Sequence, residues 1–584
     1  MKDTHQQVVH ADIPFRIRIG VTGHRKLPDE NALSENTQQV LSLLTEVIQT
    51  IKAGKTLRET DVPLKKALYN LFDKDSRKAI YSSPVTPITF SILTPLAEGA
   101  DRLVAKDVLK FQDSRIEVVL PLTKEDYLED FETEESKHEF EELLNKARRP
   151  ITLRKYLLKK SYRHEDLAES RRQAYKAVGQ YVVNRCDILI ALWDGEPSRG
   201  KGGTAEIVEY ATKRKRTVII ISTGGSREIT VKPGHGLNAR SIQQIEMFNT
   251  YPLSLDTQTE YVDNMYKGTF YQKEEKKFPE EVRTLIKEKL IPYYARASLL
   301  AKWYQKLYLW TGTVAYTLSA LAIAAVATGI LNSRLSFYAF LLEFLLLVTI
   351  FSFVTFANRK KAHKKWVENR FLAERIRSAR FFVACGAEML PIEIPPYMGI
   401  AHQPDDWMIR VFHEIWNRLP ALKGCETLNP QQLNAYIRRH WVQDQIKYHR
   451  KKKTTTGKKS KILEWTGYIL FLIAMTVAIT HAISHFQVHE LHHSLLNDVL
   501  TFFAIVLPVT GAVIGGIRSH REYSRLEKRS KNMEVVLKDL KERYSQIMRF
   551  EELESLLRET DELMLRETQD WLMLMRFVEL KPEA

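Results

Sequence analysis

Four runs of apolar residues constrain the fold of this chain more than any other feature of its sequence. They lie in its second half, at 307–331, 335–357, 465–483 and 499–517. A helix needs about 20 apolar residues to cross a bilayer, and each run has about this length. The first run holds no charged residue, and the second holds only Glu343. We therefore expect four membrane-spanning helices rather than helices buried in a large soluble protein.

The four runs form two pairs, which predicts two helical hairpins. Lys and Arg gather on the outer flanks of both pairs, whereas the turn at 332–334 has one Arg and the loop 484–498 has no Lys or Arg. Positive side chains favour the cytoplasmic side of a membrane. We therefore predict that both hairpin tips face away from the cytoplasm and that both termini face into it. In a bacterium this is a multi-pass protein of the inner membrane.

Several residues inside the runs carry expectations of their own. Glu343 is costly in hydrocarbon unless it faces protein or water, so it predicts either a pore-lining carboxylate or a structural hydrogen bond. Pro508 predicts a kink in the fourth span. Gly511, Gly515 and Gly516 predict close approach of a neighbouring helix there.

Composition narrows the class of protein. Lys and Arg exceed Asp and Glu by 87 to 71, a net charge of +16. Much of the excess lies beside the spans, where it favours topology signals and lipid headgroup contacts over nucleic-acid binding. The three cysteines form no Cys-x-x-Cys pair, which argues against a zinc site and a disulfide framework and fits a reducing cytosol. We expect no bound metal, although His485 and His489 have a spacing that would allow one.

The first 255 residues, by contrast, alternate short aliphatic segments with helical patterns. Strands are predicted at 16–21, 88–93, 116–120, 188–193 and 218–222, and helices at 31–52, 100–111, 137–147, 165–184 and 205–213. This alternation favours an α/β Rossmann-like domain with a parallel sheet covered by helices on both faces. In such sheets the ligand binds beyond the carboxyl ends of the strands.

Glycine and polar residues gather at three of these strand ends. The candidate ligand-binding residues there are Gly20, Thr22, Gly23, His24, Arg25, Glu98, Gly99, Asp101, Arg102, Asp194, Gly195, Arg199, Lys201, Gly202, Gly203, Thr204 and Glu206. A glycine-rich loop that leads into a helix offers free N–H groups and a positive dipole end. Arg199 and Lys201 add positive charge beside that loop. The sequence therefore predicts a site for a nucleotide or another phosphate-bearing ligand.

The same motifs resemble a known superfamily. GVTGHR, LAEGADRLVA, CDILIALWDG and GKGGTAEIVEYA resemble the SLOG superfamily, which includes cytokinin-activating phosphoribohydrolases, DNA-processing protein A and the N-terminal region of TRPM channels. The membrane half, with Trp366 and Arg370 after the second span and Trp441 and Asp444 before the third, resembles the SLATT family of membrane effector modules. Because two hairpins are present, the module looks duplicated.

The resemblance implies that the chain senses a nucleotide-derived signal made during phage infection and then perturbs or permeabilises the inner membrane. A membrane-tethered N-glycosidase, either a phosphoribohydrolase or an NAD-cleaving enzyme, is the alternative, with Glu98 or Glu206 as acid or base. The related enzymes carry Pro-Gly-Gly-x-Gly-Thr-x-x-Glu; here the proline is missing and the acid follows Thr204 by two places, which favours a sensor. A housekeeping ligand-gated ion channel is the second alternative and rests on Glu343 alone.

The predicted segments and partners follow from these features. The segments are a SLOG-like domain (1–255), a helical linker (256–304), the first hairpin with a trailing helix (305–380), a cytoplasmic connecting segment (381–460), the second hairpin (461–520) and C-terminal cytoplasmic helices (521–584). Heptad-like spacing of Met533, Leu537, Leu540, Tyr544 and Ile547 suits either self-association or packing within the chain. We expect a homo-oligomer, because a pore built from four spans needs several copies. The expected ligand is a nucleotide or an ADP-ribose-like molecule rather than a cofactor, made by an enzyme encoded nearby. The polar start of the chain predicts no cleavable signal peptide.

Overall fold

A computed structural model describes residues 12–153, 167–197, 202–224, 228–251, 259–265, 278–389, 407–420, 429–487 and 495–576 of the chain. The chain divides into two compact units. Residues 1–255 and 391–422 form the first, and residues 256–390 and 423–584 form the second. The first unit is therefore discontinuous in sequence, because the chain returns to it between the two predicted hairpins.

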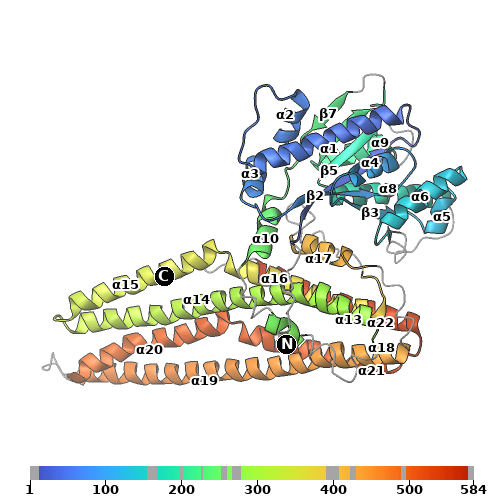
Figure 1. Ribbon diagram of the computed structural model, residues 1–584. Coiled ribbons are helices and arrows are strands. Elements are labelled where there is room, and N and C mark those ends of the chain that lie inside the picture. The colour runs from blue at the N-terminus through green and yellow to red at the C-terminus, as the bar shows by residue number, and fades with distance from the viewer. Residues whose placement is uncertain are drawn as a thin grey trace, which may run out of the picture. The chain divides into compact units, whose positions relative to one another are not determined.

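A seven-stranded sheet forms the centre of the first unit, in the order β4-β3-β2-β1-β5-β6-β7 (Figure 1). The strands are β1 (Phe15–Gly23), β2 (Ile88–Thr94), β3 (Arg115–Leu120), β4 (Ile151–Thr152), β5 (Ile188–Trp193), β6 (Thr217–Ser222) and β7 (Ile229–Lys232). The first six pair in parallel, and β7 pairs antiparallel with β6. The predicted Rossmann-like α/β fold is confirmed, with β4 and β7 as edge strands that the sequence did not indicate.

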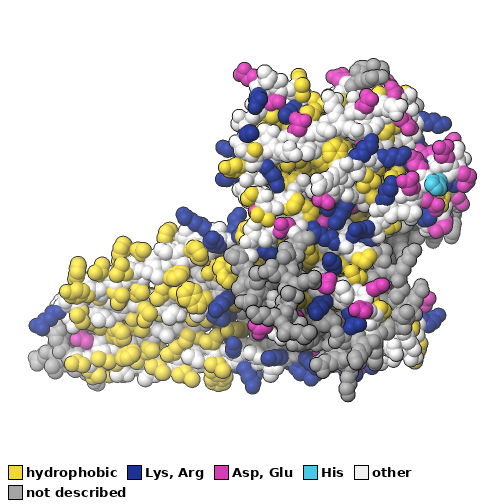
Figure 2. All heavy atoms as spheres, viewed as in Figure 1, with side chains coloured by type: hydrophobic (Ala, Val, Ile, Leu, Met, Phe, Trp, Pro, Cys, Tyr) yellow, Lys and Arg dark blue, Asp and Glu magenta, His cyan; other side chains and the backbone are white. Residues whose placement is uncertain are grey.

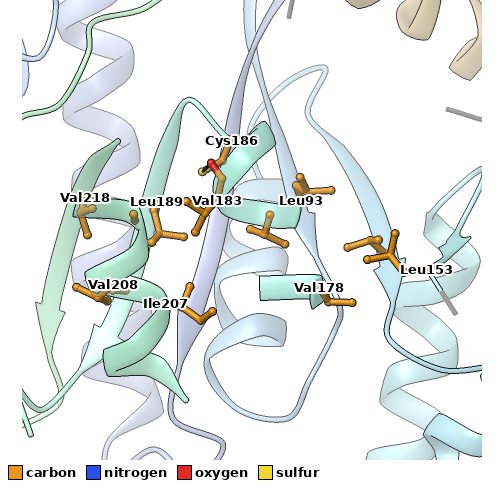
Figure 3. Close-up of a cluster of buried hydrophobic side chains, with 13 residues drawn as sticks. Leu93, Leu153, Val178, Val183, Cys186, Leu189, Ile207, Val208 and Val218 are labelled. Atoms are coloured by element: carbon orange, nitrogen blue, oxygen red, sulfur yellow. Dashed lines mark hydrogen bonds between the residues drawn. The ribbon is translucent and has the colours of Figure 1, made fainter. Parts of the chain in front are cut away.

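Helices cover both faces of this sheet, because its central strands are apolar on both sides. α1 (Glu30–Lys52) and α4 (Ala100–Leu109) pack against each other, as do α8 (Leu167–Arg185) and α9 (Thr204–Lys213). Figure 3 shows the core under α8 and α9, where Val183 and Ile207 pack over Leu189. A Cβ on Gly20 would lie 2.7 Å from Cγ1 of Val182, so this glycine lets α8 approach β1.

The remaining helices of the first unit lie in its connections. Among the described residues they are α2 (Pro63–Asn70), α3 (Lys74–Tyr81), α5 (Lys124–Leu128), α6 (Glu134–Lys146), α10 (Ala239–Thr250) and α17 (Trp407–Asn417). α17 comes from the segment expected to connect the hairpins. Ion pairs hold it: Glu414 lies 2.8 Å from Arg16, and Arg410 lies 2.6 Å from Asp187. The connecting segment thus contributes a helix to the first unit.

The second unit contains four helices that are long and apolar enough to cross a membrane, as expected. Their apolar parts lie in α14 (Ile291–Leu331), α15 (Ser336–Arg359), α19 (Gln443–Gln487) and α20 (Leu495–His520). α14 packs against α15, and α19 packs against α20 (Figure 1). Hydrophobic side chains cover the visible face of these helices (Figure 2). Phe337 is 71% exposed and Phe471 is 66% exposed, as lipid-facing residues would be.

The two halves of the second unit repeat one another. A π-helical segment precedes each hairpin, at Leu285–Leu290 before α14 and at Arg438–Val442 before α19. A left-handed non-glycine residue ends each hairpin, Lys361 at φ 50° and Glu522 at φ 52°. A further helix follows in each half, α16 (Ala362–Cys385) and α21 (Tyr523–Ser545). This shared order supports the duplication that the sequence suggested only by its two hairpins.

The described part of this unit also contains the helices α13 (Glu280–Thr284), α18 (Pro430–Ile437) and α22 (Phe550–Arg576). The heptad-like residues Met533, Leu537, Leu540 and Tyr544 of α21 are buried within the unit. The Tyr544 hydroxyl lies 2.9 Å from the Thr560 hydroxyl of α22. Of the two alternatives for this heptad-like spacing, the structure shows packing within the chain.

The residues singled out inside the spans have different surroundings. Glu343 is half-buried on α15 and has no hydrogen-bond or ion-pair partner within the described part of the chain. α20 continues through Pro508. A Cβ on Gly516 would lie 2.6 Å from the Tyr316 ring of α14, whereas one on Gly511 or Gly515 would meet no atom of the described residues within 4 Å. Of the three glycines, therefore, only Gly516 lies where a neighbouring helix approaches closely.

Candidate ligand-binding site

A cavity of about 350 Å³ lies at the carboxyl ends of β1 and β5 in the first unit. These two strands are neighbours at the centre of the sheet. Strands β2, β3 and β4 follow β1 toward one edge of the sheet, and β6 and β7 follow β5 toward the other edge. The loops that leave β1 and β5 diverge at this reversal, which is where open α/β sheets bind their ligands.

The predicted site residues separate into three groups. Nine of them line the cavity: Thr22, Gly23, His24, Arg25, Asp101, Asp194, Gly202, Gly203 and Thr204. Six lie near it without lining it: Gly20, Glu98, Gly99, Arg102, Gly195 and Glu206. The two remaining residues, Arg199 and Lys201, fall outside the described residues. The structure thus brings the three predicted strand-end loops together around one space.

His24 and Asp194 form the polar wall between β1 and β5. Nε2 of His24 lies 3.1 Å from Oδ1 of Asp194, and the Asp194 backbone N–H donates to the same nitrogen at 3.3 Å. Partial burial acts to raise the pKa of Asp194. Hydrogen bonds with the Glu196 N–H and with His24 have the opposite and larger effect together, so the pKa of Asp194 lies below its usual range. Asp194 is therefore an ionised acceptor at neutral pH.

Asp101 differs from Asp194 because its side chain is buried. Its carboxylate accepts hydrogen bonds from the Thr94 hydroxyl and the Ala97 N–H, both at 3.2 Å. Burial nevertheless dominates and raises the pKa of Asp101 to about 7. The cavity wall therefore contains one carboxyl group that changes its charge near neutral pH.

Aromatic side chains that the sequence did not indicate complete the cavity. Tyr127 of α5 and Tyr175 of α8 line it, as does Trp193 at the end of β5. Both tyrosine hydroxyls are buried without a hydrogen-bond partner among the described residues. The guanidinium of Arg25 lies 5.9 Å from the centre of the Tyr175 ring. The wall thus offers two hydroxyls, a positive charge and flat apolar surfaces.

A periodic signal on α8 was available in the sequence. Tyr175, Val178, Gly179 and Val182 all line the cavity, and their spacings of three, four and seven put them on one helix face. A helix face that combines a tyrosine with small and β-branched residues also occurs in ordinary cores. That this face of α8 contacts the cavity beside the loop after β1 follows only from the order of the strands in the sheet, which the sequence pattern does not give.

Two of the predicted residues that do not line the cavity fix its loops instead. Gly99 has φ +73° immediately before α4, and a Cβ there would overlap the Arg25 carbonyl oxygen. Arg102 donates to the Leu96 carbonyl at 3.2 Å and to Glu139 at 2.8 Å. These contacts tie the loop after β2 to the loop after β1 and to α6.

The two acids proposed for catalysis also have structural partners. Glu98 accepts a hydrogen bond from the Ser136 hydroxyl at 2.5 Å. Glu206 accepts from the Gly202 N–H at 2.7 Å and pairs with Lys176 at 2.5 Å. Neither carboxylate lines the cavity, so the geometry does not favour either of them as an acid or base.

The N-terminus of α9 supplies the remaining wall. Gly202, Gly203, Thr204 and Ala205 line the cavity there. α9 begins at Thr204, and among the described residues no side chain caps its first N–H groups. Free N–H groups at a helix start, together with the helix dipole, favour a negatively charged ligand group. This wall and Arg25 therefore suit a phosphate.

Within the described residues, no group of three His, Cys, Asp or Glu side chains is placed to hold a metal ion. His489 and the side chain of His485 fall outside the described part of the chain. No protein-family model, no curated protein and no solved structure matches this chain. The function must therefore be inferred from the site itself.

Proposed function

We propose that the first unit binds a nucleotide-derived signal and that the second unit responds by perturbing or permeabilising the inner membrane. In this proposal the first unit is a SLOG-like sensor and the second is a duplicated SLATT-like effector that acts as a homo-oligomer in anti-phage defence. The observation that carries the proposal is the cavity at the reversal of strand order. Its volume of about 350 Å³ falls in the range of small-molecule sites, roughly 300–1,000 Å³.

The wall chemistry supports a nucleotide over an apolar ligand. The α9 N-terminus and Arg25 suit a phosphate, and Trp193 and Tyr175 offer flat surfaces for a base. His24 and Asp194 supply hydrogen-bonding groups between them. A ligand of this kind can activate the second unit only if it binds the active arrangement more tightly than the resting one.

The proposal includes an orientation in the membrane. Both termini, and hence the sensor, face the cytoplasm, because Lys and Arg flank the hairpins on that side. Reporter fusions after residue 584 and within 332–334 would test it: a cytoplasmic signal is expected from the first fusion and an external one from the second. The reverse pattern would refute the orientation.

The binding proposal is tested on the full-length protein in detergent. We would measure equilibrium binding of a panel of nucleoside phosphates, cyclic and linear dinucleotides and ADP-ribose. A charged hydrogen bond contributes about 1.5–3 kcal/mol, so Arg25→Ala should weaken binding roughly tenfold or more. Lys26→Ala is the matched control, because Lys26 is an exposed neighbour of the same charge outside the cavity wall.

Two results would refute the binding proposal. One is a wild-type protein that binds no member of the panel. The other is an equal loss of binding in the Arg25 and Lys26 variants, because a general charge effect would then explain the affinity. Dye leakage from vesicles that contain the protein would separately test whether the bound nucleotide permeabilises a bilayer.

N-glycosidic cleavage is the second candidate, and one observation favours it. Asp101 lines the cavity with a pKa of about 7, and such perturbed acids are common at catalytic sites. Asp101 would then take the acid or base role instead of Glu98 or Glu206. Release of free base from a nucleoside monophosphate or NAD, lost in Asp101→Asn, would support cleavage; binding without turnover would exclude it.

A further inference from the structure

A second cavity, of about 370 Å³, lies inside the helical unit. Its walls come from α14 and α16 of the first repeat and from α19, α20 and α21 of the second, with residues of α22. Wall residues such as Ser298 and Lys452 precede the apolar runs of their helices. The cavity therefore lies between the repeats, at the basic end of the four spans.

The wall of this cavity carries more positive than negative charge. Eight Lys and Arg side chains line it, against four Asp and Glu. The acids are already engaged by arginines: Glu374 pairs with Arg370 at 2.5 Å and also with Arg377, and Glu567 pairs with Arg529 at 2.9 Å. The carboxylates of the wall therefore do not neutralise its lysines.

Three lysines of the wall have no carboxylate partner among the described residues. Lys302 of α14 donates a hydrogen bond to the Tyr261 hydroxyl at 3.1 Å. Lys459 of α19 lies 6.0 Å from the centre of the Tyr523 ring. Lys452, about two turns before it on the same helix, lines the same space. Uncompensated positive charge in a partly enclosed space favours a bound anion.

His449 gives independent evidence that the cavity accepts a polar ligand. Its side chain lines the cavity and is only 3% exposed. Neither of its ring nitrogens has a hydrogen-bond partner within the described residues. A neutral imidazole carries one N–H donor, and a buried donor without a partner is costly. An oxygen acceptor inside the cavity would satisfy it.

We propose that this cavity binds the phosphate group of an anionic ligand between the two repeats. Lys302 holds the phosphate from the first repeat, Lys452 and Lys459 hold it from the second, and His449 donates a hydrogen bond. The phosphate belongs either to a phospholipid headgroup, which the position beside the spans favours, or to a soluble phosphate compound. This site is separate from the nucleotide site of the first unit and does not depend on it.

Full-length protein in neutral detergent would test the proposal. Two probes are used: inorganic phosphate, at ionic strength matched with chloride, and phosphatidylglycerol in mixed micelles, compared with phosphatidylcholine. Binding is measured as a thermal shift and by native mass spectrometry. The Lys452→Gln/Lys459→Gln variant should bind roughly tenfold more weakly than the wild type. Lys302→Gln should also bind more weakly, because it removes a charge from the opposite repeat.

The matched control is Lys451→Gln/Lys458→Gln, which removes the same charge from the same helix at exposed positions outside the wall. It should bind as the wild type does. Binding of phosphate alone would identify a soluble ligand, and saturable binding of phosphatidylglycerol alone would identify a lipid headgroup. Binding of neither probe, or an equal loss in the control, would overturn the proposal. Lys302→Gln keeps the test decisive if the double variant does not fold.

Discussion

Asp101 illustrates how one residue type acquires two behaviours in a single cavity. It is 6% exposed and shares the cavity with Asp194, whose side chain stays partly exposed to water. Both carboxylates accept backbone hydrogen bonds, yet burial raises the pKa of Asp101 to about 7 and the pKa of Asp194 is lowered. Arg25 and Arg102 favour the charged form of Asp101 but do not overcome its burial. The degree of burial thus decides the charge state.

This difference predicts how stability depends on pH. Between pH 4 and 7 folded Asp101 keeps a proton that the unfolded chain, with a pKa near 3.8, has already lost. The stabilisation is complete below about pH 4 and is lost as the pH rises toward 7. Asp101→Asn keeps an acceptor for Thr94 and Ala97 but does not titrate. Its thermal midpoint should therefore fall less than that of the wild type between pH 5 and pH 8.

The size of the effect is at most about 4 kcal/mol, because one pKa unit corresponds to about 1.4 kcal/mol. Thermal unfolding of the full-length protein, followed by fluorescence at several pH values, would measure it. Glu35→Gln is the control, because Glu35 is exposed on α1 and its substitution should leave the pH dependence unchanged. Parallel pH profiles for Asp101→Asn and the wild type would contradict the assigned pKa.

The sequence predicted those helices and strands whose position depends on a local pattern of apolar residues. The five apolar strands and the four spans were evident because burial on both sides, or in lipid, demands continuous apolar runs. β4 has two residues and β7 only four, too few for a periodic signal. α17 was not predicted as part of the first unit, because its ion pairs with Arg16 and Asp187 join residues more than 200 positions apart.

The residues of the candidate site also separate into those that local sequence patterns predicted and those that they did not. Its loops were predicted because glycine and charge after a strand are local signals, and nine of their residues line the cavity. Tyr127 and Tyr175 were missed because their helices reach the cavity only through the sheet order. Glu98 and Arg102 were assigned to the ligand, yet their hydrogen bonds to Ser136 are structural. A polar residue in a loop can serve the loop itself, and sequence alone does not distinguish the two roles.

Packing between the hairpins leads to a prediction about α14 and α20. These helices contact each other, and a side chain at Gly516 would meet the Tyr316 ring 2.6 Å from its Cβ. Overpacking of this kind costs about 1–3 kcal/mol. Gly516→Val should therefore lower the thermal stability of the detergent-solubilised protein. Size-exclusion chromatography after heating would measure the loss as a lower temperature of aggregation.

Gly511→Val is the matched control on the same helix, since no atom in the described part of the chain lies within 4 Å of a Cβ at this position. It adds the same side chain without a clash between the hairpins and should aggregate at the wild-type temperature. If both valine variants lost stability equally, the effect would come from α20 alone, and the contact with α14 would not contribute.

The whole molecule joins a discontinuous α/β unit to a helical unit whose two halves share one order of elements. Each has a cavity where two structural halves meet: at the reversal of strand order in the first, and between the repeats in the second. In both proposals, side chains from two halves bind one ligand, and binding would then change how the halves pack against each other. The chain crosses between the units more than once, so the first unit is completed only after the first hairpin has been made.

This chain order predicts that residues 12–255 do not form the complete first unit. They lack α17, whose Trp407, Phe412 and Ile415 are buried, and which supplies Arg410 and Glu414 as ion-pair partners. Burial of each large apolar side chain contributes about 1.5–3 kcal/mol. A polypeptide in which residues 407–420 follow 12–255 through a flexible linker should therefore unfold at a clearly higher urea concentration than 12–255 alone.

Circular dichroism during urea unfolding would compare the two polypeptides. The control is the same fusion with Glu414→Lys, which places a positive charge against Arg16 and Arg115 instead of the carboxylate that pairs with them at 2.8 and 3.1 Å. This fusion has the same length and nearly the same apolar surface, but its lysine would be buried against the arginines that Glu414 pairs with. A buried charge without an opposite partner is strongly destabilising, so α17 should not dock in its native position and the fusion should recover little of the stability. Equal midpoints for 12–255 with and without α17 would show that the helix only rests on the unit. A gain that survives Glu414→Lys would assign the stabilisation to apolar contacts rather than to the buried ion pairs.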